Sequence, residues 1–407
     1  MGVRWLYLPI EVKVRECDAK LLLAYYAVKQ GYQVVIGDHP GVEELCETYP
    51  EGIFFSKGGP HGFRKRVLVH AKEYHHKIVE LDEEGLIFQR NLYIQDRMQK
   101  QSLNLVDQEY CWGSHQYKTI LAAYPDLSGK LHITGNPRFD LLTPKYRKMY
   151  DREKHELIEQ YGEFLLINTR FSQYNTAKGM KETVHYKHIQ KLYHLFILMI
   201  KEIAEHFPDK TVIIRPHPGE SFTSYRKAVK PYSNVHVIHE GNIIPWLYAA
   251  KSVIHNGCTS GIEASLMDRP VISYVPFETM EPKLPNQSGQ IATTSKEVIT
   301  LIQKVFDGEK LPKPQVSEMD DFKWSTTNYS YQSILSLCNQ ISLSPPLKKI
   351  IIKEEAVQLS RIKKRKRNFS LTKEEILSFF QKLNQLNETE LRCQITRIGN
   401  HVYHLTC

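Results

Sequence analysis

The sequence contains no long apolar run. Its longest, LYHLFILMI at 192–200, is far shorter than the roughly 18 residues that a membrane-spanning helix needs. The run that opens the chain covers only about six residues before charged residues follow, which is too short for the core of a signal peptide. We therefore expect a protein that stays in the cytoplasm.

Cysteines are few and scattered. There are seven, an odd number, and none belongs to a CxxC pair. This pattern argues against a disulfide framework and against a zinc site, and it favours a reducing compartment. We expect no metal site.

Positive charge is concentrated in one segment. The formal net charge is +9, and residues 348–367 hold nine Lys or Arg against two Glu, which is +7 of that total. Such a run suits an anionic membrane surface or nucleic acid, and it is also typical of a solvated helix face. Of the two partners, we expect the membrane surface.

Length and apolar patterning predict more than one domain. The chain has 407 residues, of which 42% are apolar, and this is long for a single core. Over the first 140 residues, short apolar runs alternate with helix-like stretches, which indicates a parallel sheet flanked by helices. A first helix is expected to be capped by Asp18 and ended by Gly31. Strands are expected at 4–10, 32–37, 52–56, 76–81, 109–113 and 130–135.

A polar segment near residue 150 is interpreted as an inter-domain linker, and a second alternating set follows it. Its strands are expected at 164–169, 210–215, 235–239, 252–256 and 270–275, with helices at 186–206 and 261–268. The two sets predict a pair of Rossmann-like α/β domains, residues 1–150 and 151–340, that face each other across a cleft.

Residues 341–407 read as a small α+β extension. Thr372 and Glu375 have the spacing of a capping box and predict the start of a helix. The tail RCQITRIGNHVYHLTC alternates polar and apolar residues around Gly399-Asn400, which predicts a β-hairpin.

Ligands of open parallel sheets bind outside the carboxyl ends of the strands, so polar residues directly after strands are site candidates. In the first domain these are Asp82, Glu83, Glu84 and Gly85, where a partly buried carboxylate can serve as a general base. The alternative is an exposed, inert acidic turn. Two further loops qualify by position, one with Glu11, Arg15 and Glu16 and one with Gly135, Asn136 and Pro137.

In the second domain, RPHP ends a strand with a cation and an imidazole between prolines, a combination that suits a phosphate. The segment HNGCTSGIEASL places small residues before a helix, whose unpaired N–H groups can hold a phosphate. The alternative there is a capped turn without a ligand. The segment LLINTR adds Asn168, Thr169 and Arg170 to the same cleft. The residues expected to bind the donor are Arg215, Pro218, Asn168, Thr169, Asn256, Gly257, Thr259, Ser260, Gly261 and Glu263.

Three motifs in this order resemble a known group. Glu83-Glu84-Gly85, His217-Pro218 and Thr259-Ser260 are similar to the hallmarks of GT-B glycosyltransferases that use CMP-activated acid sugars, namely bacterial sialyltransferases, polysialyltransferases and Kdo transferases. Roughly residues 1–300, including LPIEVKVRECDAKLLLAYYAVKQGYQVVIG, also resemble bacterial surface carbohydrate biosynthesis proteins.

The resemblance implies a GT-B fold, with an acceptor site in the first domain and a CMP-sugar site in the second. It implies that Glu83 or Glu84 deprotonates the acceptor hydroxyl and that His217 contacts the CMP phosphate. Asp82 leaves the position of the base open, because the motif can also be read one residue earlier. The acceptor would be a surface glycan or a lipid-linked glycan. The CMP-sugar would be the donor substrate, with no cofactor and no metal.

Two other classes of function stay open. One is a UDP-sugar 2-epimerase or a teichoic-acid-type glycerophosphotransferase with the same architecture. The other is a non-catalytic protein that binds a membrane surface or nucleic acid through residues 348–367.

Overall fold

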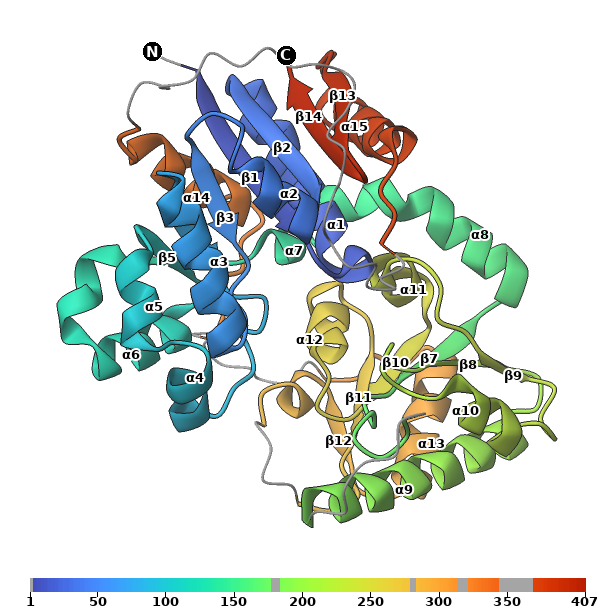
Figure 1. Ribbon diagram of the computed structural model, residues 1–407. Helices are drawn as coiled ribbons and strands as arrows, with labels where there is room; N and C mark the ends of the chain where they lie inside the picture. The colour runs from blue at the N-terminus through green and yellow to red at the C-terminus, as the bar shows by residue number, and fades with distance from the viewer. Residues whose placement is uncertain (1–2, 177–183, 279–282, 313–320, 344–368) are drawn as a thin grey trace. The chain divides into compact units, whose positions relative to one another are not determined.

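The computed structural model describes residues 3–176, 184–278, 283–312, 321–343 and 369–407. The chain forms two compact units, Met1–Met149 with Glu318–Cys407, and Tyr150–Ser317. Each unit is built on a single sheet with helices around it (Figure 1). The basic run at 348–367 lies outside the described residues.

The sheet of the first unit has the strand order β13-β14-β2-β1-β3-β4-β5-β6. Strands from β2 to β6 are parallel, and β1 pairs with β2 from Arg4↔Tyr32 to Ile10↔Asp38. The strands are β1 (Arg4–Ile10), β2 (Tyr32–Asp38), β3 (Ile53–Ser56), β4 (Lys77–Leu81), β5 (Gln108–Cys111), β6 (Leu131–Ile133), β13 (Gln394–Gly399) and β14 (Val402–Thr406). The six strands expected in this part of the chain are confirmed.

The helices of the first unit include α1, which covers Lys13–Lys29. It ends two residues before Gly31, whose φ of 85° suits a glycine that ends a helix. The expected start at Asp18 was wrong, because Val12 occupies the N-cap and Glu16 lies in the first turn. The others are α2 (His39–Leu45), α3 (His61–Glu73), α4 (Arg90–Asp96), α5 (Lys100–Leu105), α6 (Ser114–Ala123), α7 (Pro137–Asp140), α14 (Ser330–Gln340) and α15 (Lys373–Asn387).

The second unit has a parallel sheet with the order β12-β11-β10-β7-β8-β9. Its strands are β7 (Phe164–Asn168), β8 (Thr211–Arg215), β9 (Val235–Val237), β10 (Ser252–His255), β11 (Val271–Tyr274) and β12 (Gln290–Ala292). Its helices are α8 (Asp151–Tyr161), α9 (Val184–His206), α10 (Phe222–Ala228), α11 (Ile243–Ala249), α12 (Thr259–Leu266) and α13 (Ser295–Phe306).

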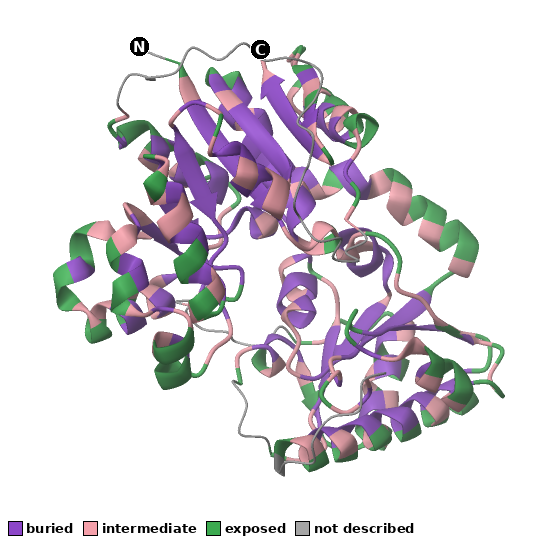
Figure 2. Ribbon diagram, viewed as in Figure 1, coloured by how far each residue is buried: buried purple, intermediate pink, exposed green. Residues whose placement is uncertain are grey.

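The core of the second unit lies between this sheet and the apolar face of α9. Leu192, Phe196 and Ile203 of α9 are buried at helical spacing against strand residues such as Leu165 and Ile254. The central strands of both units are buried along their length, which is typical of parallel sheets covered on both faces (Figure 2). The predicted pair of parallel α/β domains is confirmed.

Two expectations about the domain boundaries were wrong. The segment interpreted as a linker forms α8, an amphipathic helix that has no buried residue and packs on α11. The C-terminal residues are not a separate extension, because β14 pairs antiparallel with β2 and so covers an edge that would otherwise expose unpaired backbone groups. The predicted capping box and hairpin are confirmed, but they belong to the first unit.

α14 also belongs to the first unit, although it lies within the expected span of the second domain, 151–340. The guanidinium of Arg4 in β1 donates to the carbonyl oxygens of Cys338 and Ile341, at 2.7 and 2.8 Å, at the end of α14. At the other end, the buried Asp140 carboxylate accepts from the backbone N–H groups of Ser330 and Tyr331, at 2.9 and 3.0 Å.

Within the described part of the chain, no helix is both long and apolar enough to cross a bilayer.

We predict that Arg4→Met destabilises the first unit by about 2 kcal/mol, because two charge-assisted bonds to the end of α14 are lost. Arg152→Met is the matched control, since Arg152 is exposed and bonds only a neighbouring turn of its own helix through Glu156. The control is expected to melt at the same temperature as wild type. Scanning calorimetry measures the melting temperatures of both variants. Equal melting temperatures for Arg4→Met and Arg152→Met would contradict the role given to Arg4.

Candidate functional site

In the first unit, Asp82 fixes the turn that follows β4. Its carboxylate accepts from Nε of Arg97 at 2.8 Å and from a second guanidinium nitrogen, and its carbonyl accepts from the indole N–H of Trp112 at 2.7 Å. Asp82 is buried, and these contacts give it a structural role in the turn.

Glu83 is the buried carboxylate of this turn. Its backbone N–H donates to the carbonyl of Lys57 at 3.1 Å, which ties the turn to the loop after β3. The side chain is only 6% exposed, and its Oε2 has no hydrogen-bond partner among the described residues. Burial, followed by the negative charge of Glu16, raises the pKa of Glu83, while Lys20 and Arg15 oppose this shift.

Glu84 lies outside this environment. It is exposed, and its Oε1 accepts from Arg15 at 2.8 Å. Arg15 is also within 3.4 Å of Glu16, whose second oxygen accepts from the backbone N–H of Glu11. The loop after β1 therefore lies beside the Asp82–Gly85 turn, as expected from strand order.

Lys20 is a charged neighbour of Glu83 that the sequence patterns did not single out. It is buried on the inner face of α1, and its ammonium lies 3.9 Å from the centre of the Phe55 ring. Burial lowers the pKa of Lys20, and the carboxylates of Glu83 and Glu16 oppose this. A local cation of this kind favours the ionised form of Glu83.

Gly85 is required by close packing. A Cβ there would lie 2.7 Å from the Trp112 ring and 2.8 Å from the Gln116 amide.

Behind the turn, the buried Arg64 donates from Nε to the carboxylate of Glu80 at 2.6 Å. Arg64 also donates to the backbone carbonyl of Arg97. This network holds Arg97, and Arg97 holds Asp82.

The third candidate loop of the first unit is structural. The side chain of Asn136 accepts from the backbone N–H of Arg138 at 2.9 Å and caps α7. Gly135 has a φ of 79°, and a Cβ there would lie 2.5 Å from the hydroxyl of Ser330.

In the second unit, the loop after β8 carries His217 at the surface. His217, Pro218 and Gly219 are exposed, whereas Pro216 and Glu220 on either side are buried. The backbone N–H of Gly219 donates to Nδ1 of His217 at 3.1 Å. Since Nδ1 accepts, the neutral ring carries its proton on Nε2, which makes Nε2 a hydrogen-bond donor.

Arg215 does not supply the cation expected at this loop. Its guanidinium donates to the carbonyl oxygens of Glu240 and Gly241, at 2.8 and 2.6 Å, and lies 5.3 Å from the Trp246 ring. Burial lowers the pKa of Arg215 to about 10. Its contacts hold the loop after β9.

The cation next to the second phosphate candidate is Arg170. Its Nε donates to the carbonyl of Asn256 at 2.9 Å, and its guanidinium packs so closely on Gly257 that a Cβ there would lie 2.6 Å from Nη2. Gly257 also has a φ of 60°, so both the close contact and the positive φ favour glycine at this position. Burial lowers the pKa of Arg170.

The N-terminus of α12 lies directly after this loop. Helix N-termini leave backbone N–H groups without intrahelical partners and carry partial positive charge. Thr259 is half-buried there, while Ser260 is buried, accepts from the Asn168 amide at 2.9 Å and donates to the Cys258 sulfur. A guanidinium and a helix N-terminus thus meet at one loop, which favours an anion.

Two other predicted residues have structural contacts. The Asn256 amide donates to the Tyr274 carbonyl at 2.7 Å, and the Thr169 hydroxyl donates to Glu220 at 2.9 Å. Glu263 is buried in the first two turns of α12. Gly261 packs on the buried His255 ring, and burial lowers the pKa of that histidine to about 3.

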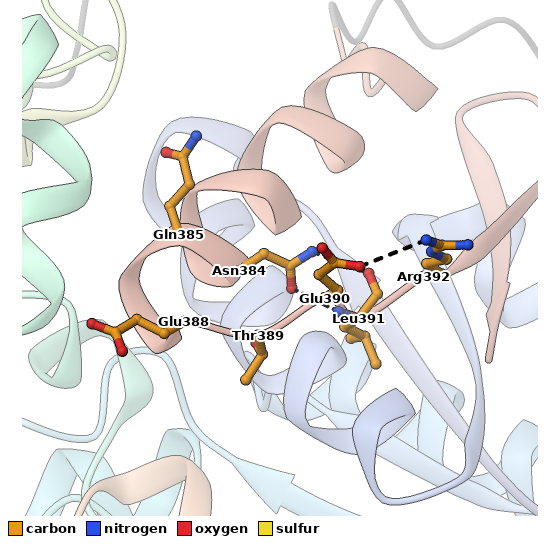
Figure 3. Close-up of a pocket in the computed structure, with 7 residues that line it drawn as sticks. All are labelled: Asn384, Gln385, Glu388, Thr389, Glu390, Leu391 and Arg392. Carbon is orange, nitrogen blue, oxygen red and sulfur yellow. Dashed lines mark hydrogen bonds and ion pairs between the residues drawn. The ribbon is translucent and has the colours of Figure 1, made fainter.

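A hollow of about 480 Å³ lies elsewhere, at the C-terminal end of α15 (Figure 3). Its lining includes Asn384, Glu390 and Arg392, and Glu390 and Arg392 form an ion pair at 3.6 Å. None of the predicted site residues lines this hollow.

In the described ranges, no group of three or more His, Cys, Asp or Glu side chains could hold a metal ion.

Among solved structures, the chain is similar to UDP-GlcNAc 2-epimerases. The Neisseria meningitidis enzyme bound to UDP-GlcNAc has a TM-score of 0.54 at 13% identity, covering 84% of this chain and 100% of that one. The Methanocaldococcus jannaschii enzyme in complex with UDP-GlcNAc and UDP has a TM-score of 0.52 at 11% identity, covering 83% and 99%.

The wall teichoic acid polymerase TagF is also similar, with a TM-score of 0.52 at 11% identity over 83% of this chain and 88% of that one. These likenesses show the fold, which is GT-B-like, as the motif resemblance implied. No protein-family model matches the chain, and no curated protein matches it.

We predict that Gly261→Ala disrupts the start of α12, because the new Cβ would lie 2.1 Å from Nε2 of the buried His255. Overpacking of this kind costs about 1–3 kcal/mol. Gly62→Ala in the first turn of α3 is the control, since a Cβ there meets nothing within 4 Å. It is expected to be neutral or slightly stabilising. Melting temperatures test the pair, and a Gly261→Ala protein as stable as wild type would refute this packing.

Proposed function

We propose that the protein is an enzyme that acts on a nucleotide-activated sugar and breaks the bond between the sugar and its phosphate. The observation that carries this proposal is Glu83, a buried carboxylate at the carboxyl end of β4 with a raised pKa and one oxygen that has no hydrogen-bond partner in the described part of the chain. Such a group suits a general base, whose optimum pKa lies closer to neutrality than that of an ordinary glutamate.

The second unit supports the proposal with an anion site. Arg170 and the N-terminus of α12 offer positive charge to a phosphate. Nε2 of His217 offers a hydrogen bond from the loop after β8, which β7 separates from β10, the strand before α12. These groups can offset the charge of a departing phosphate without a metal ion.

Two more specific functions are each supported by a different observation. The comparisons favour a UDP-sugar 2-epimerase, because solved relatives of the fold are UDP-GlcNAc 2-epimerases, two of them with UDP-GlcNAc bound. In that reaction, Glu83 would take a proton from the sugar ring. This function was the alternative in the sequence interpretation.

The order Glu83-Glu84-Gly85, His217-Pro218, Thr259-Ser260 favours instead the transfer of an acid sugar from a CMP-sugar to a glycan or glycolipid acceptor. In that reaction, Glu83 would take the proton of the acceptor hydroxyl. The membrane partner expected of residues 348–367 stays a prediction that belongs with this second function.

A nucleotide panel separates the two. We expect either UDP or CMP, each tested at 100 times its Kd, to stabilise the folded protein by about 2.7 kcal/mol. Thermal unfolding with UDP, CMP and CDP measures this. UDP alone would select the epimerase, CMP alone the acid-sugar transferase and CDP alone a glycerophosphotransferase, whereas no shift with any of them would contradict a nucleotide-dependent enzyme.

We predict that Glu83→Gln lowers the rate by about 10²–10⁴-fold, the usual contribution of a general base. Because a base acts when ionised, wild-type activity should rise with pH through the raised pKa of Glu83 and be lost below it. Glu84→Gln should cost less than about fivefold, since an exposed ion pair contributes about 1 kcal/mol or less. Initial rates across pH decide, and an equal loss in both variants would contradict the assignment of the base to Glu83.

A further inference from the structure

Glu220 lies three residues after His217, and the sequence patterns did not single it out. Its buried carboxylate accepts three hydrogen bonds, two of them at Oε1. The backbone N–H of His217 donates to Oε1 at 3.0 Å, and the Thr169 hydroxyl donates to the same oxygen at 2.9 Å. The Tyr225 hydroxyl donates to Oε2 at 2.6 Å.

The backbone closes the same turn from the other side. The N–H of Glu220 donates to the carbonyl of His217 at 2.9 Å. Residues 217–220 are therefore joined by two bonds between the first and last residue, one through the main chain and one through the carboxylate. Within this turn, the N–H of Gly219 reaches Nδ1 of the His217 ring.

We propose that Glu220 is a positioning residue that selects the tautomer of His217. By holding the turn closed, it keeps the Gly219 N–H against Nδ1, so that the neutral ring carries its proton on Nε2. The role of that Nε2–H as a donor to the substrate phosphate rests on the proposed function. The selection of the tautomer does not, because it follows from contacts within the loop.

The contacts indicate that shape, rather than charge, is what Glu220 provides. All three of its donors are neutral groups, and an amide oxygen can accept from His217 and Thr169 as a carboxylate does. Tyr225 can in turn accept from the amide NH₂ of a glutamine. Glu220→Gln is therefore expected to preserve the turn, and Glu220→Ala to release it.

The test is a nitrogen NMR spectrum of the ring of His217 at pH 8, in protein labelled with ¹⁵N-histidine and assigned by the signal that disappears in His217→Ala. Wild type and Glu220→Gln should show one neutral tautomer, with the proton on Nε2. Glu220→Ala should show a mixture of the Nε2–H and Nδ1–H forms. For the nucleotide that stabilises wild type, the Kd should rise about tenfold in Glu220→Ala, equivalent to about 1.4 kcal/mol, and stay within twofold in Glu220→Gln.

Tyr225→Phe is the matched control, because it removes the Tyr225 bonds to the Glu220 carboxylate and to the Thr169 hydroxyl but leaves the two bonds that close the turn. It should lower the melting temperature and leave the His217 spectrum unchanged. A single Nε2–H tautomer in folded Glu220→Ala would overturn the proposal, and so would a mixture in Tyr225→Phe or in Glu220→Gln. If the spectra behave as expected but wild type binds no nucleotide, the proposed function fails and the role of Glu220 stands.

Discussion

The first unit is organised around one constraint: a carboxylate lies in a buried site where one of its oxygens has no hydrogen-bond donor among the described residues. Glu83 cannot be placed there without cost, since a buried charge needs compensation. The nearby cations Lys20 and Arg15 provide part of this compensation. Asp82, held by Arg97, and Arg97, held by the buried Arg64, fix the position of the turn. Gly85 then lets the turn approach Trp112.

The second unit meets the opposite electrostatic requirement. Arg170 lies beside the N-terminus of α12, where the partial positive charge of a helix end favours an anion. The pKa of His255 under this helix is lowered by burial and further by Arg170, so the histidine stays neutral and packs against Gly261. His217 lies in the loop after β8, and β7 separates that strand from β10 in the sheet.

Local patterns predicted the elements of this protein well and their partners poorly. The apolar runs of β1 and β8, the capping box of α15 and the hairpin at Gly399 each depend on neighbouring residues, and the structure confirms them. The pairing of β14 with β2 joins residues more than 360 positions apart, and no local pattern shows which sheet edge a hairpin will cover. The same holds for α14, which is fixed by Arg4.

The same difference between local pattern and three-dimensional contact applies to the residues of the candidate site. Residue type alone could not tell Glu83 from its neighbours, because the Arg97 contact separates it from Asp82 and burial separates it from Glu84. Arg215 was expected to be a phosphate cation, yet its side chain reaches the carbonyls of the loop after β9, whereas Arg170, also expected in the cleft, lies near the N-terminus of α12. Glu220 acts through the backbone of His217, a contact that carries no sequence signature beyond its spacing.

The central claim is that the loop before α12 holds the phosphate of a nucleotide-activated sugar. It is tested most directly by a crystal structure of the Glu83→Gln variant with an intact nucleotide sugar bound. The account predicts the phosphate against the first N–H groups of α12 and beside Arg170. A nucleotide bound elsewhere, for example in the hollow at the end of α15, would contradict it.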